Sequence, residues 1–153
     1  MRSIEIHPGL QTRRGLHLVP RVPPGRPART ALTAVVPLER VDEGARIALG
    51  TAISCAPRHT LALHVHVDGQ GPVDAFTRDW ERWDPGVALV LLHDDGRGPT
   101  ATVADHLEHL VADTVLVVEP WREGEQADPN GTDELTVRLQ HLPHVVVSHQ
   151  QVP

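Results

Sequence analysis

The chain has 153 residues, with 14 basic side chains that are all arginine, 20 acidic ones, a single cysteine and a formal net charge of −6. This length predicts one domain that is large enough to bury a hydrophobic core. The single cysteine excludes an internal disulfide framework and a zinc site of several cysteines. No apolar run approaches the ~20 residues that span a bilayer, and no secretory signal is visible, so we expect a soluble, cytoplasmic protein without a membrane span.

The charge is divided unevenly along the chain. Residues 1–29 carry six arginines, five prolines and one glutamate, for a net charge of +5, whereas residues 30–153 carry −11. So many prolines prevent a helix, and we expect a largely flexible arm over residues 1–29 before one domain over residues 30–153. The acidic domain is a poor partner for nucleic acid. The arm could contact a polyanion or an anionic membrane surface, although arginines without amphipathic spacing are more typical of a solvated tail.

The hydrophobic pattern after the arm alternates regularly between strand and helix. Short apolar runs predict strands over residues 31–38, 60–67, 87–92, 114–118 and 144–148, and helical spacing predicts helices over residues 43–56, 73–84, 99–113 and 132–142. Strands that alternate with helices imply right-handed crossovers between parallel strands. The predicted fold class is therefore α/β, a five-stranded parallel sheet in the order 3-2-1-4-5 with helices on both faces.

Several side chains are expected in the core of this fold. Phe76, Trp80 and Trp83 recur at helical spacing and would form the buried face of the second helix. Val111 would lie on the buried face of the third helix, and Cys55 would be a small core residue of the first. The unbroken apolar run over residues 87–92 predicts a strand that is covered on both faces.

The order and spacing of these elements resemble the universal stress protein family of nucleotide-binding α/β domains. A more specific similarity is to the cytosolic C-terminal domain of bacterial amino acid permeases, which is itself universal-stress-like. It is carried by Val36-Pro37-Leu38-Glu39-Arg40, Gly44 at the start of an alanine-rich helix, the strand Leu63–Asp68 and the run Asp79-Trp80-Glu81-Arg82-Trp83-Asp84-Pro85-Gly86-Val87-Ala88-Leu89-Val90. The resemblance covers residues 31–118 well and residues 130–149 loosely. It implies a non-catalytic, regulatory or ligand-sensing domain.

The phosphate-binding loop of the family is only partly present. Universal stress proteins that bind ATP carry a Gly-x-x-Gly after the fourth strand and, about nine residues later, a Gly-Ser or Gly-Thr pair at the last helix. Gly131 and Thr132 match the final pair, but Gly124 has a different spacing, and residues 119–132 hold four acidic side chains against Arg122. This loop is a poor cradle for a triphosphate.

The sheet order nevertheless places a candidate ligand crevice between the first and fourth strands, beyond their carboxyl ends. Arg40 and Arg122 could pair with a phosphate, Trp121 could stack on a base, and Asp68 could bind a ribose hydroxyl. The remaining candidates that line the crevice are Pro37, Leu38, Gly131 and Thr132. The resemblance implies ATP, AMP or cyclic di-AMP as the ligand. The alternative is a vestigial cleft that is filled by its own side chains and water.

Catalytic and metal-binding motifs do not emerge from the sequence. There is no Walker loop, Gly-x-Ser-x-Gly elbow or Cys-x-x-Cys, so we expect no catalytic residues and no enzyme activity. Histidines occur in pairs that lie on different predicted elements, so no metal site is expected; these pairs are His64 with His66, His106 with His109, and His141 with His144.

The last strand would lie at an edge of the sheet, where an apolar strand invites pairing. Universal stress proteins commonly dimerise through this strand, so the resemblance implies a homodimer through Val145, Val146 and Val147. The alternative to ligand sensing is a protein–protein interaction module. A transporter is one expected partner, and since the chain begins with Met and has no membrane helix, that transporter would be a separate polypeptide.

Overall fold

The computed structural model describes residues 30–67, 73–122 and 134–152 of the chain. The described residues form a five-stranded, all-parallel sheet in the order β3-β2-β1-β4-β5, which confirms the predicted fold class and strand order. The strands and helices alternate as β1 (Leu32–Pro37), α1 (Glu43–Cys55), β2 (Thr60–His66), α2 (Val73–Trp83), β3 (Ala88–His93), α3 (Pro99–His109), β4 (Thr114–Arg122), α4 (Glu134–Leu139) and β5 (Val145–Val152).

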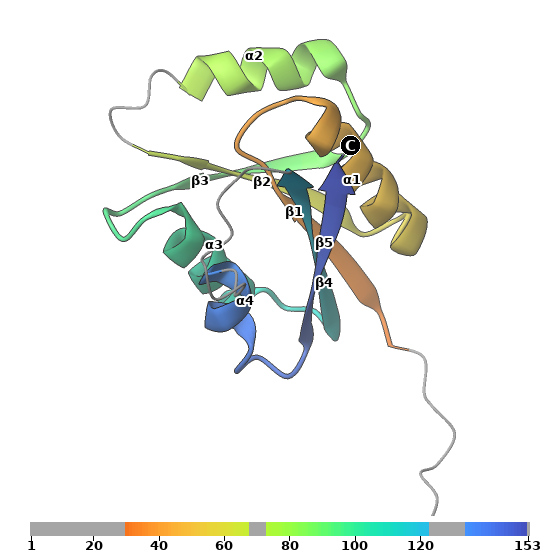
Figure 1. The fold of residues 1–153 in the computed structure, drawn as a ribbon, viewed down its shortest axis with the longest axis vertical. Coiled ribbons are helices and arrows are strands. Elements are labelled where there is room, and N and C mark those ends of the chain that lie inside the picture. The colour runs from red at the N-terminus through yellow and green to blue at the C-terminus, as the bar shows by residue number, and fades with distance from the viewer. Residues whose placement is uncertain (1–29, 68–72, 123–133, 153) are drawn as a thin grey trace, which may run out of the picture.

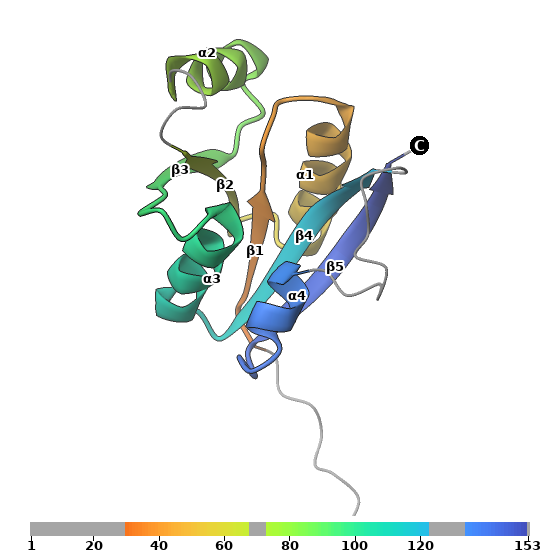
Figure 2. The same cartoon turned by 60° about the vertical axis from the view of Figure 1, so that its left-hand side comes forward.

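Two helices cover each face of the sheet (Figures 1 and 2). Side chains alternate along a strand, so neighbouring residues of β1 enter different cores: Val36 packs beneath α1 and α2, and Val35 beneath α3 and α4. The small side chains of Ala45, Ala48 and Ala52 are fully buried. They allow α1 to lie close to the middle of the sheet, as their packing in the core with Ala34 and Val36 shows.

The aromatic face of α2 is buried as predicted. Phe76 and Trp80 are each 8% exposed and belong to the core under α1 and α2, with Trp83 packed against it. Their rings lie next to one another, with centroids 6.2 Å apart for Phe76 and Trp80 and 5.6 Å apart for Trp80 and Trp83.

Three predicted burials are wrong. Val111 is fully exposed because α3 ends at His109 and Leu110 turns to an extended conformation that leads the chain into β4. The expectation that the edge strand β3 is covered on both faces fails, since Leu91 is 45% exposed. Cys55, the last residue of α1, is exposed rather than part of the core.

The last two strands are longer than their apolar runs predict. β4 continues beyond Val118 to Arg122, and β5 continues to Val152, with paired residues along the whole extension. The pairing of β1 with β4 ends at Val35 and Val117, so Pro120, which has no N–H to donate, removes no bond to β1. The pairing of β4 with β5 therefore sustains a strand that its own hydrophobic pattern does not predict.

Candidate functional site

The order of the strands reverses between β1 and β4, which places the candidate crevice beyond the carboxyl ends of these two strands. Directly after β1, Leu38 is only 4% exposed and belongs to the core under α1 and α2. Its backbone N–H donates to the Leu63 carbonyl at 2.8 Å, and its carbonyl accepts from the His64 ring nitrogen Nδ1 at 2.8 Å. Pro37 and Leu38 therefore hold the end of β1 rigidly against β2.

Arg40, which was predicted to pair with a phosphate, follows the end of β1 and already pairs with a carboxylate. Its guanidinium Nε is 3.1 Å from the Asp42 carboxylate, and both side chains are partly exposed. Asp42 is also the N-cap of α1, because its carboxylate accepts the backbone N–H of Ala45 at 3.0 Å. A carboxylate thus occupies the helix end that would otherwise attract an anion.

The first turn of α1 adds a second negative charge. Glu43 accepts a hydrogen bond from the Arg46 guanidinium, with Nε to Oε2 at 2.7 Å. This bond, together with the charge of Arg46, holds the pKa of Glu43 below its ordinary value, so the carboxylate is charged near neutral pH. Both carboxylates near the start of α1 oppose a phosphate unless a cation separates them from it.

The carboxyl ends of β4 and β5 carry a polar cluster that the sequence did not reveal. The Glu119 carboxylate lies 3.5 Å from Nδ1 of His149 on β5, and Nε2 of that ring lies 3.4 Å from the Thr136 hydroxyl on α4. On the other face of β5, the Thr51 hydroxyl of α1 donates to Oε1 of Gln150 at 2.9 Å. These contacts join the carboxyl end of β5 to helices on both faces. Only the strand register, which is a tertiary property, brings residues 119, 136 and 149 together.

The structure shows the positions of some of the predicted site residues. Pro37, Leu38 and Arg40 come together at the end of β1, as expected. Trp121 and Arg122 were expected in a loop, but their backbone belongs to β4 and pairs with residues 151 and 152 of β5. The roles expected of the Trp121 and Arg122 side chains, and of Asp68, Gly131 and Thr132, lie outside the described part of the structure.

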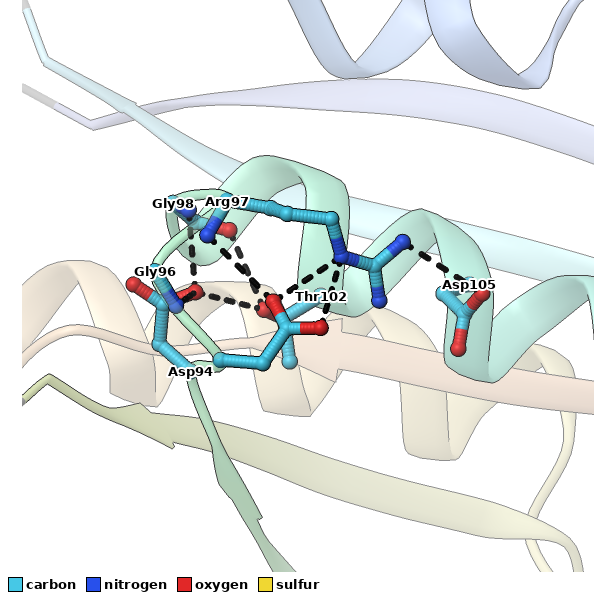
Figure 3. Close-up of polar contacts among 7 residues, drawn as sticks. Asp94, Gly96, Arg97, Gly98, Thr102 and Asp105 are labelled. Carbon is cyan, nitrogen blue, oxygen red and sulfur yellow. Dashed lines mark hydrogen bonds and ion pairs between the residues drawn. The ribbon is translucent and has the colours of Figure 1, made fainter.

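A buried carboxylate organises the connection from β3 to α3 (Figure 3). Asp94 is 8% exposed, and its Oδ1 accepts from the backbone N–H groups of Gly96 at 3.2 Å and Gly98 at 2.9 Å and from the Thr102 hydroxyl at 3.1 Å. Gly96 and Gly98 have φ angles of 93° and 94°, which a side chain would strain. The sequence analysis did not identify this role of Asp94; the Asp-x-Gly-x-Gly pattern at residues 94–98 is the signal that could have indicated it.

The histidine pairs form no metal centre in the described residues. His64 instead stacks on Phe76, with ring centroids 3.7 Å apart, and so belongs to the packing of α2 on the sheet. His66 and His93 lie on neighbouring strands with centroids 6.0 Å apart. Within residues 30–67, 73–122 and 134–152, no group of three or more His, Cys, Asp or Glu side chains is arranged to hold a metal ion.

The family model described as the C-terminal domain of the KimA potassium transporter matches residues 29–150. The chain belongs to this family. No curated protein matches the chain. The prediction that the chain is a transporter-associated C-terminal domain is confirmed. The transporter of this family carries potassium, whereas the sequence analysis expected a similarity to amino acid permeases. No helix of the described residues is long and apolar enough to cross a membrane.

Proposed function

We propose that this domain is a cytoplasmic, non-catalytic regulator of a potassium transporter, and that it senses an adenine nucleotide in the crevice between β1 and β4. ATP, AMP and cyclic di-AMP are the candidate ligands, as the universal-stress-like reading of the sequence implies. The observation that carries the proposal is the family match over residues 29–150. The reversal of strand order supplies the place, because open parallel sheets bind ligands at such a point.

Arg40 is the described side chain best placed to meet a phosphate in this crevice. It is more than half exposed and lies next to the rigid end of β1, which Leu38 anchors through two backbone contacts. A phosphate that paired with Arg40 would compete with Asp42 for the same guanidinium. Because the arginine fork can bind two oxygens of a phosphate, this exchange of partners is chemically reasonable.

The test is the melting temperature of the full chain with ATP, AMP and cyclic di-AMP, followed by calorimetry. A ligand that binds the native state raises the melting temperature by several degrees when its concentration is about 100 times its dissociation constant. Arg40→Gln should weaken the binding about tenfold or more, because it removes a charge-assisted hydrogen bond. Arg46→Gln is the matched control, since Arg46 is an exposed arginine near the start of α1 that pairs with Glu43. Unchanged melting with all three nucleotides would contradict ligand sensing.

The second candidate is a protein–protein interaction module with a vestigial nucleotide cleft. It is favoured by the carboxylates of Asp42 and Glu119 at the two sides of the crevice. The open edge of β5 offers a surface for such contacts, and we propose a homodimer through Val145, Val146 and Val147 in either case. Val146 is 54% exposed, whereas Val145 and Val147 pack toward the core beneath α3 and α4.

A further inference from the structure

His64 of β2 links the end of β1 to α2, which lies over this part of the sheet (Figure 1). Its side chain points to the same face as that of Ala62, toward the core under α1 and α2. Its Nδ1 lies 2.8 Å from the Leu38 carbonyl, and its ring stacks on Phe76 with centroids 3.7 Å apart and an angle of 6° between the planes. One side chain therefore contacts the continuation of β1 and α2 at the same time.

The contact with Leu38 defines the tautomer of His64. A carbonyl oxygen can only accept a hydrogen bond, so Nδ1 of the ring must carry the hydrogen. The pairing of β1 with β2 ends at Pro37 and Leu63, and the Leu38 N–H donates to the Leu63 carbonyl at 2.8 Å. The Leu38 carbonyl follows directly after this ladder, and the His64 ring holds it in place where the pairing of the two strands has ended.

The segment over residues 38–42 is held at both of its ends. At the start, Leu38 is fixed by its N–H, by its carbonyl and by a side chain that is buried in the core under α1 and α2. At the end, Asp42 caps α1 by accepting a backbone N–H of the first turn at 3.0 Å. Arg40 lies between these two points, with its Nε 3.1 Å from the Asp42 carboxylate. The position of Arg40 therefore depends on an anchor to which the His64 ring belongs.

We propose that His64 is a positioning residue for Arg40, and that it couples the packing of α2 to the segment over residues 38–42. The stack on Phe76 holds the plane of the imidazole ring, and this plane sets the direction in which the Nδ1–H points at the Leu38 carbonyl. A shift of α2 must therefore either turn the ring or break the stack. The inference rests on the proposed function, because it adds a way in which α2 regulates ligand binding at Arg40.

A coupling of this kind acts in both directions. A phosphate that Arg40 holds would stabilise the segment that His64 anchors, and with it the packing of Phe76 on the sheet. Conversely, a partner that moved α2 would loosen the segment and weaken the binding of the phosphate. α2 would thus regulate the ligand site, and the ligand would in turn hold α2 on the sheet.

The first test is amide hydrogen exchange of the full chain without a ligand. His64→Phe keeps a ring that can stack on Phe76 but removes the Nδ1 donor, so the Leu38 amide should exchange about fivefold faster. The Ala34 amide is the internal reference, because it donates to the His59 carbonyl at 2.8 Å at the other end of β1, and it should change less than about twofold. Unchanged exchange at Leu38 would show that the ring only fills space, and would overturn the positioning role.

The coupling to α2 is tested in the same way with two variants of that helix. Phe76→Leu removes the ring that holds His64, and should make the Leu38 amide exchange about threefold faster. Trp83→Leu is the matched control, because Trp83 packs against the same core near the end of α2 and its ring neighbour is Trp80. It should change the exchange at Leu38 by less than about twofold. Equal acceleration by both variants would show general loosening of the core and would overturn the coupling.

The tautomer of His64 gives a second, spectroscopic measurement. Nitrogen spectra of the imidazole ring, recorded at about pH 8, where free imidazole is neutral, should show the hydrogen of His64 on Nδ1 in the natural chain and in Trp83→Leu. In Phe76→Leu the signals should move toward those of an exposed histidine. A hydrogen on Nε2 in the natural chain would overturn the proposal, since the Leu38 carbonyl would then have no donor in this ring.

Binding of a ligand separates this inference from the proposed function. With whichever of ATP, AMP and cyclic di-AMP raises the melting temperature, His64→Phe should weaken binding about fivefold, and the ligand should slow the exchange of the α2 amides. Equal affinity of the natural chain and this variant would overturn the coupling. If no nucleotide binds, the proposed function fails, and the exchange of the Leu38 amide in His64→Phe and Phe76→Leu still decides whether His64 couples α2 to residues 38–42.

Discussion

Asp94 is the side chain on which the loop between β3 and α3 depends. One carboxylate oxygen accepts three hydrogen bonds there, from Gly96, Gly98 and Thr102, in a nearly buried position. Asp94→Ala would leave the backbone N–H groups of Gly96 and Gly98 without this acceptor, whereas the Thr102 hydroxyl still has the Gly98 carbonyl at 3.1 Å, so we expect a loss of about 2–3 kcal/mol in the free energy of unfolding. Asp94→Asn keeps an acceptor oxygen but loses the charge, and should lose about 1 kcal/mol.

Urea unfolding of the two variants measures these losses, with Asp95→Ala as the control. Asp95 is exposed, and its partner Arg97 holds its pKa below the ordinary value mainly through a side-chain hydrogen bond, an arrangement that contributes little to stability at the surface. If Asp94→Ala were as stable as Asp95→Ala, the three hydrogen bonds would not organise the loop.

At the same scale, the sequence predicts the burial and contacts of some side chains and not of others, for physical reasons. Phe76 and Trp80 are predictable because helical spacing alone decides which face of an amphipathic helix is buried. His64 is different: alternation assigns it a face of β2, but its stacking on Phe76 joins residues twelve positions apart. Val111 continues the apolar spacing of α3 and is exposed only because the helix stops at His109.

At the scale of the elements, the last residue of α3 is His109, a side chain whose pKa is shifted in the folded state. Nδ1 of His109 hydrogen-bonds the Asp105 carbonyl at 2.8 Å, and this bond, followed by the charges of Asp105 and Glu108, raises the pKa of His109 above its ordinary value near 6.5. Since the folded state then binds the proton more tightly than the unfolded state, the stabilisation is complete below the unfolded pKa and is lost as pH rises through the folded pKa.

His109→Gln should therefore cost more stability at about pH 5.5 than at about pH 8. The measurement is the difference in urea midpoint between the variant and the natural chain at the two pH values. Asp105→Asn keeps the backbone carbonyl but removes a nearby negative charge, so it should reduce this pH dependence. An equal difference at both pH values would show that His109 acts without its charge.

The lengths of β4 and β5 mark the limit of prediction from local pattern. Glu119 and Pro120 end the apolar run of β4, yet the strand continues to Arg122 because β5 pairs with it throughout. The continuations of the two strands beyond their apolar runs sustain each other through pairing of their backbones, which no single stretch of sequence encodes. This extension moves Trp121 and Arg122 out of the predicted loop, and with them part of the predicted crevice.

For the whole molecule, the alternation of apolar runs and amphipathic helices was sufficient to predict the parallel sheet and its order. Right-handed crossovers leave few arrangements for such a pattern. The position of the crevice followed from that order, but the partners of its side chains did not, because Arg40 with Asp42 and Glu119 with His149 depend on side-chain and strand placement.

At the scale of the whole molecule, we predict a homodimer that forms through β5. Within the described sheet, β5 pairs only with β4, so its second edge is available to another strand. A two-fold dimer would bring the exposed Val146 against its symmetry mate. At micromolar concentration, light scattering should give twice the monomer mass of 16.7 kDa. Val146→Lys should shift the protein toward the monomer, since it places like charges opposite each other across the interface.

Val137→Lys is the matched control, because Val137 is a valine of similar exposure, 41%, on α4. It should leave the mass unchanged. A monomeric natural chain would contradict the dimer, and equal dissociation of both variants would show that added charge, rather than the β5 edge, controls association.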